Sequence, residues 1–316
     1  MTGDRKKITA LGLTTLLVVV SYLFYRLGNS WEFAIQLRSS KVLAMLIVSC
    51  CVAYSSVAFQ TLTANRILTP SIMGFESVYL LLQTVIVFIY GDMTFKVLNS
   101  VDNFLLSVLC MIGFAFLLYI LIYKKGKSNM YLLLLIGLVL GILFNTMSSF
   151  MQLLIDPNDF FIIQGKMFAS FNKINDDLLV YSLVLIGALM IVGFRLTKYL
   201  DVIALGRDQA INLGLNYNRM IQIFLIIIAV MVSVSTALVG PITFFGLLVS
   251  NLTYELIKTH RHSVIIFACC LVSAITVIGG QFLMERLFAL STPISTIINF
   301  IGGLYFMYLL LKVKKI

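Results

Sequence analysis

Charge is scarce in this chain of 316 residues: Asp, Glu, Lys and Arg make up 11% of it, against roughly a quarter in an ordinary soluble domain. Hydrophobic residues make up 60%, which is too many for one water-facing domain to bury, so a soluble globular protein is excluded. The same balance excludes a disordered or fibrous chain, and four prolines with twenty glycines exclude low complexity. The composition therefore predicts an all-α polytopic membrane protein. In a membrane protein, the net charge of +10 reflects how Lys and Arg are distributed between the two sides of the membrane, so it does not indicate nucleic-acid binding.

Groups that hold metals or break bonds are also few. His260 and His262 form an H-x-H in a basic internal segment without a third ligand nearby, so we expect a solvated turn there. A Gly-Lys-Ser stretch at 126–128 resembles the tail of a phosphate-binding loop, but Leu121 stands where that motif needs glycine. No Ser-His-Asp, H-E-x-x-H or C-x-x-C arrangement appears, so we expect no catalytic residue and no protein metal ligand. The five cysteines all lie in apolar runs, as buried small side chains do: Cys50, Cys51, Cys110, Cys269 and Cys270.

Long apolar runs are abundant, and a membrane-spanning helix needs roughly 20 such residues. Ten candidate runs occur, at 8–27, 41–64, 72–90, 104–123, 130–155, 178–197, 221–239, 242–257, 264–283 and 293–311. The run 242–257 is short and follows Gly240 and Pro241, so it could be bent or partial. The first run follows a basic segment but lacks a cleavage site, which favours a retained helix over a signal peptide.

Basic residues set the expected orientation. Ten spans with a cytoplasmic N-terminus place 16 of the 23 Lys and Arg residues inside, as the positive-inside rule requires, with both chain ends cytoplasmic. The seven basic residues left outside are Arg26, Arg38, Lys41, Lys96, Lys166, Lys173 and Arg286. Only an external loop at 156–177 and an internal loop at 198–220 are long. Neither could fold alone, so residues 1–316 are expected to form one membrane domain.

Polar side chains recur on one face of two of these runs, at helical spacing. The faces consist of Ser49, Ala53, Ser56, Gln60 and Thr63 in the second run, and Gly137, Gly141, Asn145, Ser148 and Gln152 in the fifth. Lipid offers no partner to an amide, so the faces point into protein or water. Packing through small residues, with Gly137 and Gly141 as a GxxxG pair, is one interpretation. A solvated substrate path lined by Gln60, Asn145, Ser148 and Gln152 is the other.

Two breaks in the apolar pattern suggest an internal repeat. A Pro and a Gly occur at a span boundary in both 65–77 and 240–251, so Asn65 and Pro70 are expected at the inner end of the path. The runs that flank these breaks, the second to fifth and the seventh to tenth, could form two halves of opposite orientation. Span interiors carry essentially no charge, with Glu76 and Glu255 near the cytoplasmic ends of theirs. The energy for transport is therefore expected from a partner, unless transport is passive.

The internal loop carries a family resemblance. Residues 201–214, DVIALGRDQAINLG, resemble the coupling loop of type II ABC importer permeases of the iron–siderophore and cobalamin family, with its A-L-G…A…L-G pattern. Such a loop forms a short helix on the membrane surface, and Gly206 and Gly214 would allow the chain to turn sharply at its two ends. By this resemblance, Ala204, Leu205, Gly206, Ala210 and Gly214 contact an ATPase, with Leu205 as the side chain that fills its groove.

Further stretches match the same family in the correct order. Leu37 to Ala44, Asn65 to Gly74 and Gly240 to Leu247 resemble its L-R-x-P-R, N-P-L-A-x-P…L-G and G-P-I-x-F-x-G-L patterns. The stretches NRILTPSIMGFES, LIDPNDF, MFASFN and STALVGPITFFGLLVSN are most similar to Gram-positive permeases for petrobactin and related catecholate siderophores. Ser40, Lys41, Ser250 and Asn251 depart from the family pattern, which puts details of the docking site and path in doubt.

The resemblance also implies a location, partner subunits and a cargo. It implies a multi-pass permease in the plasma membrane of a bacterium, expected to be Gram-positive. Its partners would be a second permease, identical or different, two ATPase subunits that bind ATP, and an extracellular substrate-binding lipoprotein. Fe(III)–siderophore would be the cargo, and the chain itself would bind no cofactor. By resemblance, Arg38, Lys41 and Arg286 would meet acidic residues of the binding protein, although they could instead reach lipid headgroups. Two alternatives stay open: a permease for haem or cobalamin, and a secondary transporter or channel.

Overall fold

A computed structural model of the chain describes residues 2–26, 31–94, 98–123, 130–172, 175–287 and 293–313. Within these ranges every regular element is a helix. The Gly-Lys-Ser stretch at 126–128 lies outside them. Ten longer helices coincide with the ten apolar runs: α1 (Thr2–Phe24), α2 (Trp31–Leu62), α3 (Phe75–Tyr90), α5 (Ser100–Tyr123), α6 (Met130–Gln152), α8 (Asp176–Ile203), α10 (Tyr217–Val239), α11 (Phe245–Leu256), α12 (His262–Leu287) and α13 (Ile294–Val313). Shorter elements are η1 (Pro70–Met73), η2 (Gly91–Met93), α7 (Pro157–Met167) and α9 (Arg207–Asn212).

Length separates the helices that can cross a bilayer alone from those that cannot. Seven of the described helices are long and apolar enough to do so, and α3 and α13 are shorter apolar helices. Helix α11 has 12 residues, or about 18 Å of rise, which is less than the hydrocarbon thickness of a bilayer. The prediction of a bent or partial span at 242–257 agrees with this length. Ten crossings, their sidedness and the inverted halves stay predictions.

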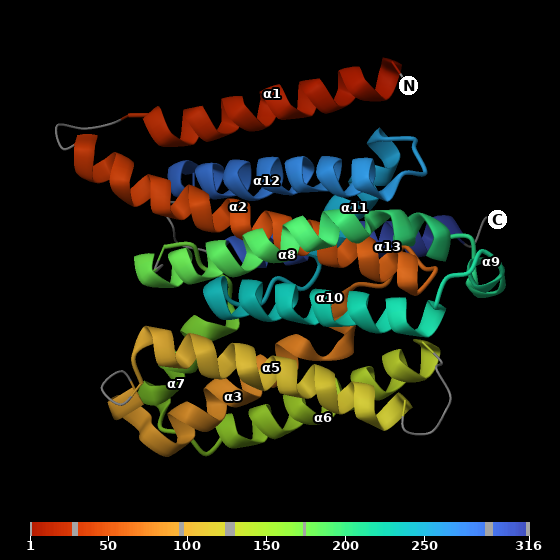
Figure 1. The fold of residues 1–316 in the computed structure, drawn as a ribbon. Coiled ribbons are helices and arrows are strands. Elements are labelled where there is room, and N and C mark those ends of the chain that lie inside the picture. The colour runs from red at the N-terminus through yellow and green to blue at the C-terminus, as the bar shows by residue number, and fades with distance from the viewer. Residues whose placement is uncertain are drawn as a thin grey trace.

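The helices run roughly side by side, with α2 in the middle of the bundle (Figure 1). Helix α2 packs against α8, α10, α11 and α12, and α1 lies at one edge against α12. Helices α3, α5, α6 and α7 form a group at the opposite edge (Figure 1). The start of α1 lies at the same end of the bundle as α9, where the Lys7 ammonium donates to the Leu256 carbonyl at 2.8 Å. The end of α1 and the start of α2 lie at the other end.

The first break in the pattern brings two segments unusually close. Gly74 ends η1 with φ +84°, and a Cβ added there would lie 2.9 Å from the Gly137 carbonyl oxygen and from the Gly141 Cα. Gly137 and Gly141 therefore serve helix packing, with η1, Gly74 and the first turn of α3 as their partners. Gly240, at the second break, has φ +101° and approaches Ala169 in the same manner. Both breaks thus rest on a left-handed glycine that meets a neighbouring backbone.

Some element boundaries differ from the sequence-based expectation. The segment 156–177, predicted as an external loop, contains α7, whose first residue is Pro157 and whose cap is the Asp156 carboxylate, accepting from the Asn158 amide at 2.9 Å. Helix α8 continues to Ile203, so the internal connection is shorter than 198–220. Helix α2 begins at Trp31, ten residues before the apolar run that predicted it. Polar residues at helix ends do not interrupt a helix, although they end the hydropathy signal.

Candidate functional site

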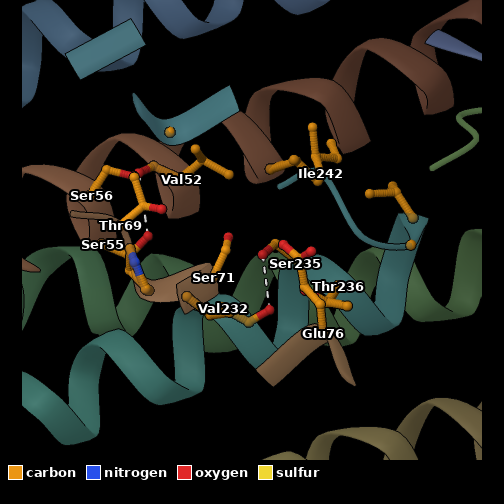
Figure 2. Close-up of a pocket in the computed structure, with 15 residues that line it drawn as sticks. Val52, Ser55, Ser56, Thr69, Ser71, Glu76, Val232, Ser235, Thr236 and Ile242 are labelled. Atoms are coloured by element: carbon orange, nitrogen blue, oxygen red, sulfur yellow. Dashed lines mark hydrogen bonds between the residues drawn. The ribbon is translucent and has the colours of Figure 1, made fainter. Parts of the chain in front are cut away.

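A small polar pocket lies where the first break meets α2 and α10. Its cavity holds about 30 Å³, enough for one or two water molecules. Figure 2 shows Ser71, Ser235, Thr236 and Glu76 on one side of it, with Val52 and Ile242 opposite. The polar residues that line the pocket come from α2, η1 with its preceding residue, α3 and α10: Ser55, Ser56, Thr69, Ser71, Glu76, Ser235 and Thr236. Pro70 is the one predicted path residue among its lining residues.

Glu76 is the acidic group of this pocket. It stands in the first turn of α3, and its Oε2 accepts a hydrogen bond from the Thr243 hydroxyl at 2.7 Å. Thr243 belongs to the segment that follows Gly240, so the carboxyl group ties the first break to the second. The nearest partners given by the structure are hydroxyl groups, which can accept or donate without carrying charge. The pocket therefore surrounds this acid with hydroxyl groups, and in the described part of the chain no basic side chain pairs with it.

Gln60 and Asn65 lie at the α9 end of α2, beside the pocket. Gln60 is 2% exposed, and its amide nitrogen donates to the Arg66 carbonyl and to the Ser250 hydroxyl, both at 2.8 Å. Its Oε1 is buried without a hydrogen-bond partner. Asn65 accepts from the Ile67 amide at 2.9 Å and so shapes the turn itself. These residues hold the first break against α11.

The three predicted path residues on α6 are separated from this pocket. Ser148 is buried and lies 2.7 Å from the Thr84 hydroxyl of α3, and Gln152 donates to both hydroxyls at 3.0 and 3.2 Å. Asn145, by contrast, is exposed on the outer face of α6. The structure thus divides the predicted path into a break region, an α3–α6 contact and one exposed amide.

The internal connection has the predicted form of a short helix between two glycines. Helix α9 spans six residues, and Gly206 and Gly214 adopt φ +102° and +82° at its two ends. We call residues 204–216 the α9 turn. Ala204 and Gly206 are exposed, and so are three large apolar side chains: Leu205 at 53%, Ile211 at 48% and Leu213 at 65%. Ala210 is fully buried beneath the turn, so it presents no surface in this structure.

The predicted docking residues gather at the opposite end of the bundle, as a basic cluster of Arg38, Lys41 and Arg286. Arg38 donates to the carbonyls of Tyr22, Leu23 and Tyr25 at the end of α1, at 2.8–3.3 Å. Arg286 donates to the Tyr25 carbonyl at 3.3 Å and stacks its guanidinium 5.0 Å from that ring. The cluster is thus bonded to the chain itself.

Lys41 has the closest charged partner in the cluster. Its ammonium lies 3.1 Å from the Glu285 carboxylate and 2.9 Å from the Asn172 amide oxygen. Glu285 also accepts from the Tyr22 hydroxyl at 2.8 Å and from Gln281 at 3.0 Å. The two side chains are 13% and 16% exposed. The positive charge of Lys41 is therefore largely compensated within the fold.

One sequence-based expectation is wrong. His262 is not part of a solvated turn: it is 7% exposed, and its Nδ1 lies 2.6 Å from the Asp201 carboxylate. The H-x-H pattern could not show this, because Asp201 is 61 residues away in sequence. Within the described ranges, no three of the residues His, Cys, Asp and Glu gather in a way that could hold a metal ion.

Several residues of the pocket were missed by sequence reasoning. Ser235 and Thr236 stand in an apolar run, and single hydroxyl groups are common in such runs. Glu76 was the one available signal, because an acid inside an apolar run needs a reason to be there. Ser55 occupies a different face of α2 from Ser56, so no single helical stripe contained both.

Comparisons with known proteins identify the family. Residues 9–312 match the FecCD transport family. The chain is 47% identical to the petrobactin import system permease protein YclO of Bacillus subtilis, over 99% of each chain. It is 34% identical to FatC and 26% identical to FatD of Bacillus anthracis, both named petrobactin import system permease proteins. The match to FatC covers 88% of this chain and 79% of FatC, and the match to FatD covers 88% and 81%.

A solved structure supports the fold. The chain superimposes with a TM-score of 0.86 on a metal-chelate type ABC transporter in an inward-facing conformation, at 22% identity. The match covers 98% of this chain and 99% of that one.

Proposed function

The chain belongs to the FecCD transport family, and we propose that it is the permease subunit of an ATP-driven ABC importer for Fe(III)–siderophore complexes of the petrobactin or catecholate type. The observation that carries this proposal is the 47% identity, over essentially the whole length, to a petrobactin import permease. The protein would lie in the plasma membrane of a Gram-positive bacterium, and its chain would cross that membrane several times. The iron would stay inside its chelate and would need no protein ligand.

We propose that ATP is hydrolysed on a separate ATPase, which contacts this chain through the α9 turn. A groove on that partner would receive Leu205, with Ala204, Gly206, Ala210 and Gly214 shaping the turn around it. Support comes from the three large apolar side chains that the turn exposes, since exposed apolar groups at a membrane surface favour burial against a partner. Two copies of the ATPase would be needed if a second permease stands beside this one.

We propose a second permease beside this one, and the small volume of the polar pocket supports it. The polar pocket holds about 30 Å³, far below the roughly 300–1,000 Å³ of a ligand pocket. A larger cavity of about 390 Å³ lies between α5 and α10, but its lining is almost entirely apolar and does not suit a polar chelate. The route for a whole siderophore is therefore proposed to open between two permease subunits. The two differently named permeases of the Bacillus anthracis system favour a heterodimer.

The predicted path residues can be tested by cysteine accessibility at positions that differ in exposure. Gln60, Asn65, Pro70, Asn145, Ser148 and Gln152 are proposed to line the route in at least one state of the cycle. In a background lacking the five native cysteines, Asn145→Cys should react with a water-soluble thiol reagent at rest, because Asn145 is exposed on α6 and the proposed route between two permeases would bring water to it. Ser148→Cys should react only during turnover, because Ser148 is 3% exposed. Protection of both throughout the cycle would assign them to packing.

The basic cluster is proposed to face an extracellular binding protein. Arg38, Lys41 and Arg286 lie together at the end of the bundle opposite α9, which is the arrangement that docking requires. Arg286 has the most exposed side chain of the three and would make the main contact. Charge reversal at Arg286 should weaken binding of the loaded binding protein, most strongly at low salt.

One experiment separates the proposal from its alternatives. Proteoliposomes containing this chain, its second permease and the ATPase should take up ⁵⁵Fe(III)–petrobactin delivered by the binding protein, only with ATP inside and regardless of ionophores. Haem or cobalamin should not be taken up under the same conditions. Uptake that needs an ion gradient and not ATP would identify a secondary transporter. Uptake of haem or cobalamin alone would assign the cargo differently.

A further inference from the structure

Three helix ends far apart in sequence are joined by one buried histidine. His262 is the first residue of α12, Asp201 lies in the last turn of α8, and Thr61 lies in the last turn of α2. The ring Nδ1 of His262 is 2.6 Å from the Asp201 carboxylate, which also accepts the His262 backbone amide at 2.8 Å. The ring Nε2 is 2.9 Å from the Thr61 hydroxyl oxygen.

The Thr61 hydroxyl lies within hydrogen-bond distance of the His262 ring and of a carbonyl of its own helix. The Thr61 hydroxyl has one proton, and it donates to the Val57 carbonyl of its own helix at 2.9 Å. The His262 ring is within hydrogen-bond distance of Thr61 through Nε2 and of Asp201 through Nδ1, so both ring nitrogens have a polar partner. Because His262 is 7% exposed, loss of either partner would leave a buried ring nitrogen without a hydrogen bond. The connection is thus specific and not a loose surface contact.

The connection lies on the line between the α9 turn and the polar pocket. Asp201 precedes Gly206, the N-cap of α9, by five residues. At the other end, Gln60 adjoins Thr61 and holds the Arg66 carbonyl at 2.8 Å. The segment after Arg66 carries Thr69, Pro70 and Ser71, which line the pocket. Asn251 of α11 donates to the same Arg66 carbonyl at 3.1 Å, so α11 is held at this point too.

We propose that Asp201, His262 and Thr61 are positioning residues that carry a displacement of the α9 turn into α2 and α12, and through α2 to the polar pocket. The proposal rests on the proposed function, because it requires an ATPase that moves the α9 turn. Its physical content is that three helix ends move together only while both hydrogen bonds of the ring are intact. Adjacency alone does not establish coupling, so the test must measure it.

A double-mutant cycle in the assembled importer provides that measurement. Thr61→Val removes the hydroxyl at nearly constant shape, and Asp201→Asn removes the charge while keeping an acceptor for the His262 amide. Each single variant should lower Fe(III)–siderophore uptake per ATP hydrolysed by about tenfold, the size expected for a lost hydrogen bond to a charged group. The double variant should lose no more than either single one, because the connection is already cut. Thr61→Ser should restore most of the wild-type ratio.

Matched controls keep the result interpretable. Thr197→Val removes a hydroxyl that is buried more deeply than that of Thr61 and donates to Phe194 within α8, at 2.7 Å, and it should leave uptake per ATP unchanged. Thermal unfolding in detergent identifies any variant that fails to fold, and Thr61→Ser then carries the comparison with Thr197→Val. Independent, additive losses in the double variant, or a wild-type ratio in Thr61→Val, would overturn the proposal. If the wild-type importer itself shows no ATP-dependent uptake, the proposed function fails and not the connection.

Discussion

The two ends of the helix bundle treat their side chains in opposite ways. At the end where α1 meets α2 and α12, the basic cluster is bonded inward, to backbone carbonyls and to Glu285. At the other end, the α9 turn directs Leu205, Ile211 and Leu213 outward. Basic residues that suggested a docking surface thus also support the fold, whereas the apolar residues of the turn contribute little to it. The α9 turn therefore leaves apolar surface uncovered after folding, whereas the basic cluster has its hydrogen-bonding groups largely satisfied.

The comparison leads to a ranking of mutational effects on stability. Substitutions in the basic cluster should destabilise the fold more when the native side chain is more buried and makes more hydrogen bonds. Substitutions in the α9 turn should leave the fold intact and act on assembly. The predictions below run from the largest expected change in the free energy of unfolding to the smallest.

Lys41→Glu should have the largest effect. It would place two carboxylates side by side in a site where the native side chains are 13% and 16% exposed, at a cost of about 3–5 kcal/mol. Denaturant unfolding of the detergent-solubilised protein measures this. The exchanged pair, Lys41→Glu with Glu285→Lys, is the control and should recover a large part of the loss. An unchanged midpoint for Lys41→Glu would mean that the pair does not support the fold.

Arg38→Gln should come next. The guanidinium satisfies three carbonyls at the end of α1, and its loss should cost about 1–3 kcal/mol. Arg286→Gln is the matched control at the same end, because Arg286 is exposed and should change stability by less than about 0.5 kcal/mol. Equal effects of the two variants would show that Arg38 does not support the fold more than Arg286 does.

Gly206→Asp should have a smaller effect of a different origin. No neighbouring atom lies within 4 Å of an added Cβ, but the backbone has φ +102°, a conformation that costs other residues on the order of 1–3 kcal/mol. Part of that strain can relax, because the turn is exposed. We expect normal insertion, a modest drop in the unfolding midpoint and loss of ATPase association or transport. Wild-type uptake by this variant would exclude the turn as the transmission element.

How far the sequence predicts this molecule depends on the range of the interaction. The ten apolar runs and the short helix between Gly206 and Gly214 were predictable, because helical period and glycine conformation act over a few residues. The Lys41–Glu285 pair joins positions 244 residues apart, which no local pattern can reveal. Ala210 was predicted to contact a partner, because a small apolar residue does not indicate which side of a turn is buried. The polar pocket is likewise assembled from α2, α3, α10 and the two breaks, so it exists only in the fold.

Leu205→Glu should have the smallest effect on stability and the sharpest effect on assembly. The side chain is 53% exposed, so the free energy of unfolding should change by less than about 0.5 kcal/mol. In a groove on the ATPase, however, the added carboxylate would be buried without a partner, at a cost of several kcal/mol. Leu153→Glu, which adds the same charge at a residue 84% exposed on the C-terminal side of α6, is the matched control.

The affinity of the purified ATPase for the solubilised permease complex tests the central claim most directly. Wild type, Leu205→Glu, Leu153→Glu and the exchanged Lys41–Glu285 pair should be titrated side by side. Leu205→Glu alone should weaken binding, by tenfold or more, with an unchanged unfolding midpoint. Wild-type affinity for Leu205→Glu would show that the α9 turn is not the ATPase contact and would contradict the account.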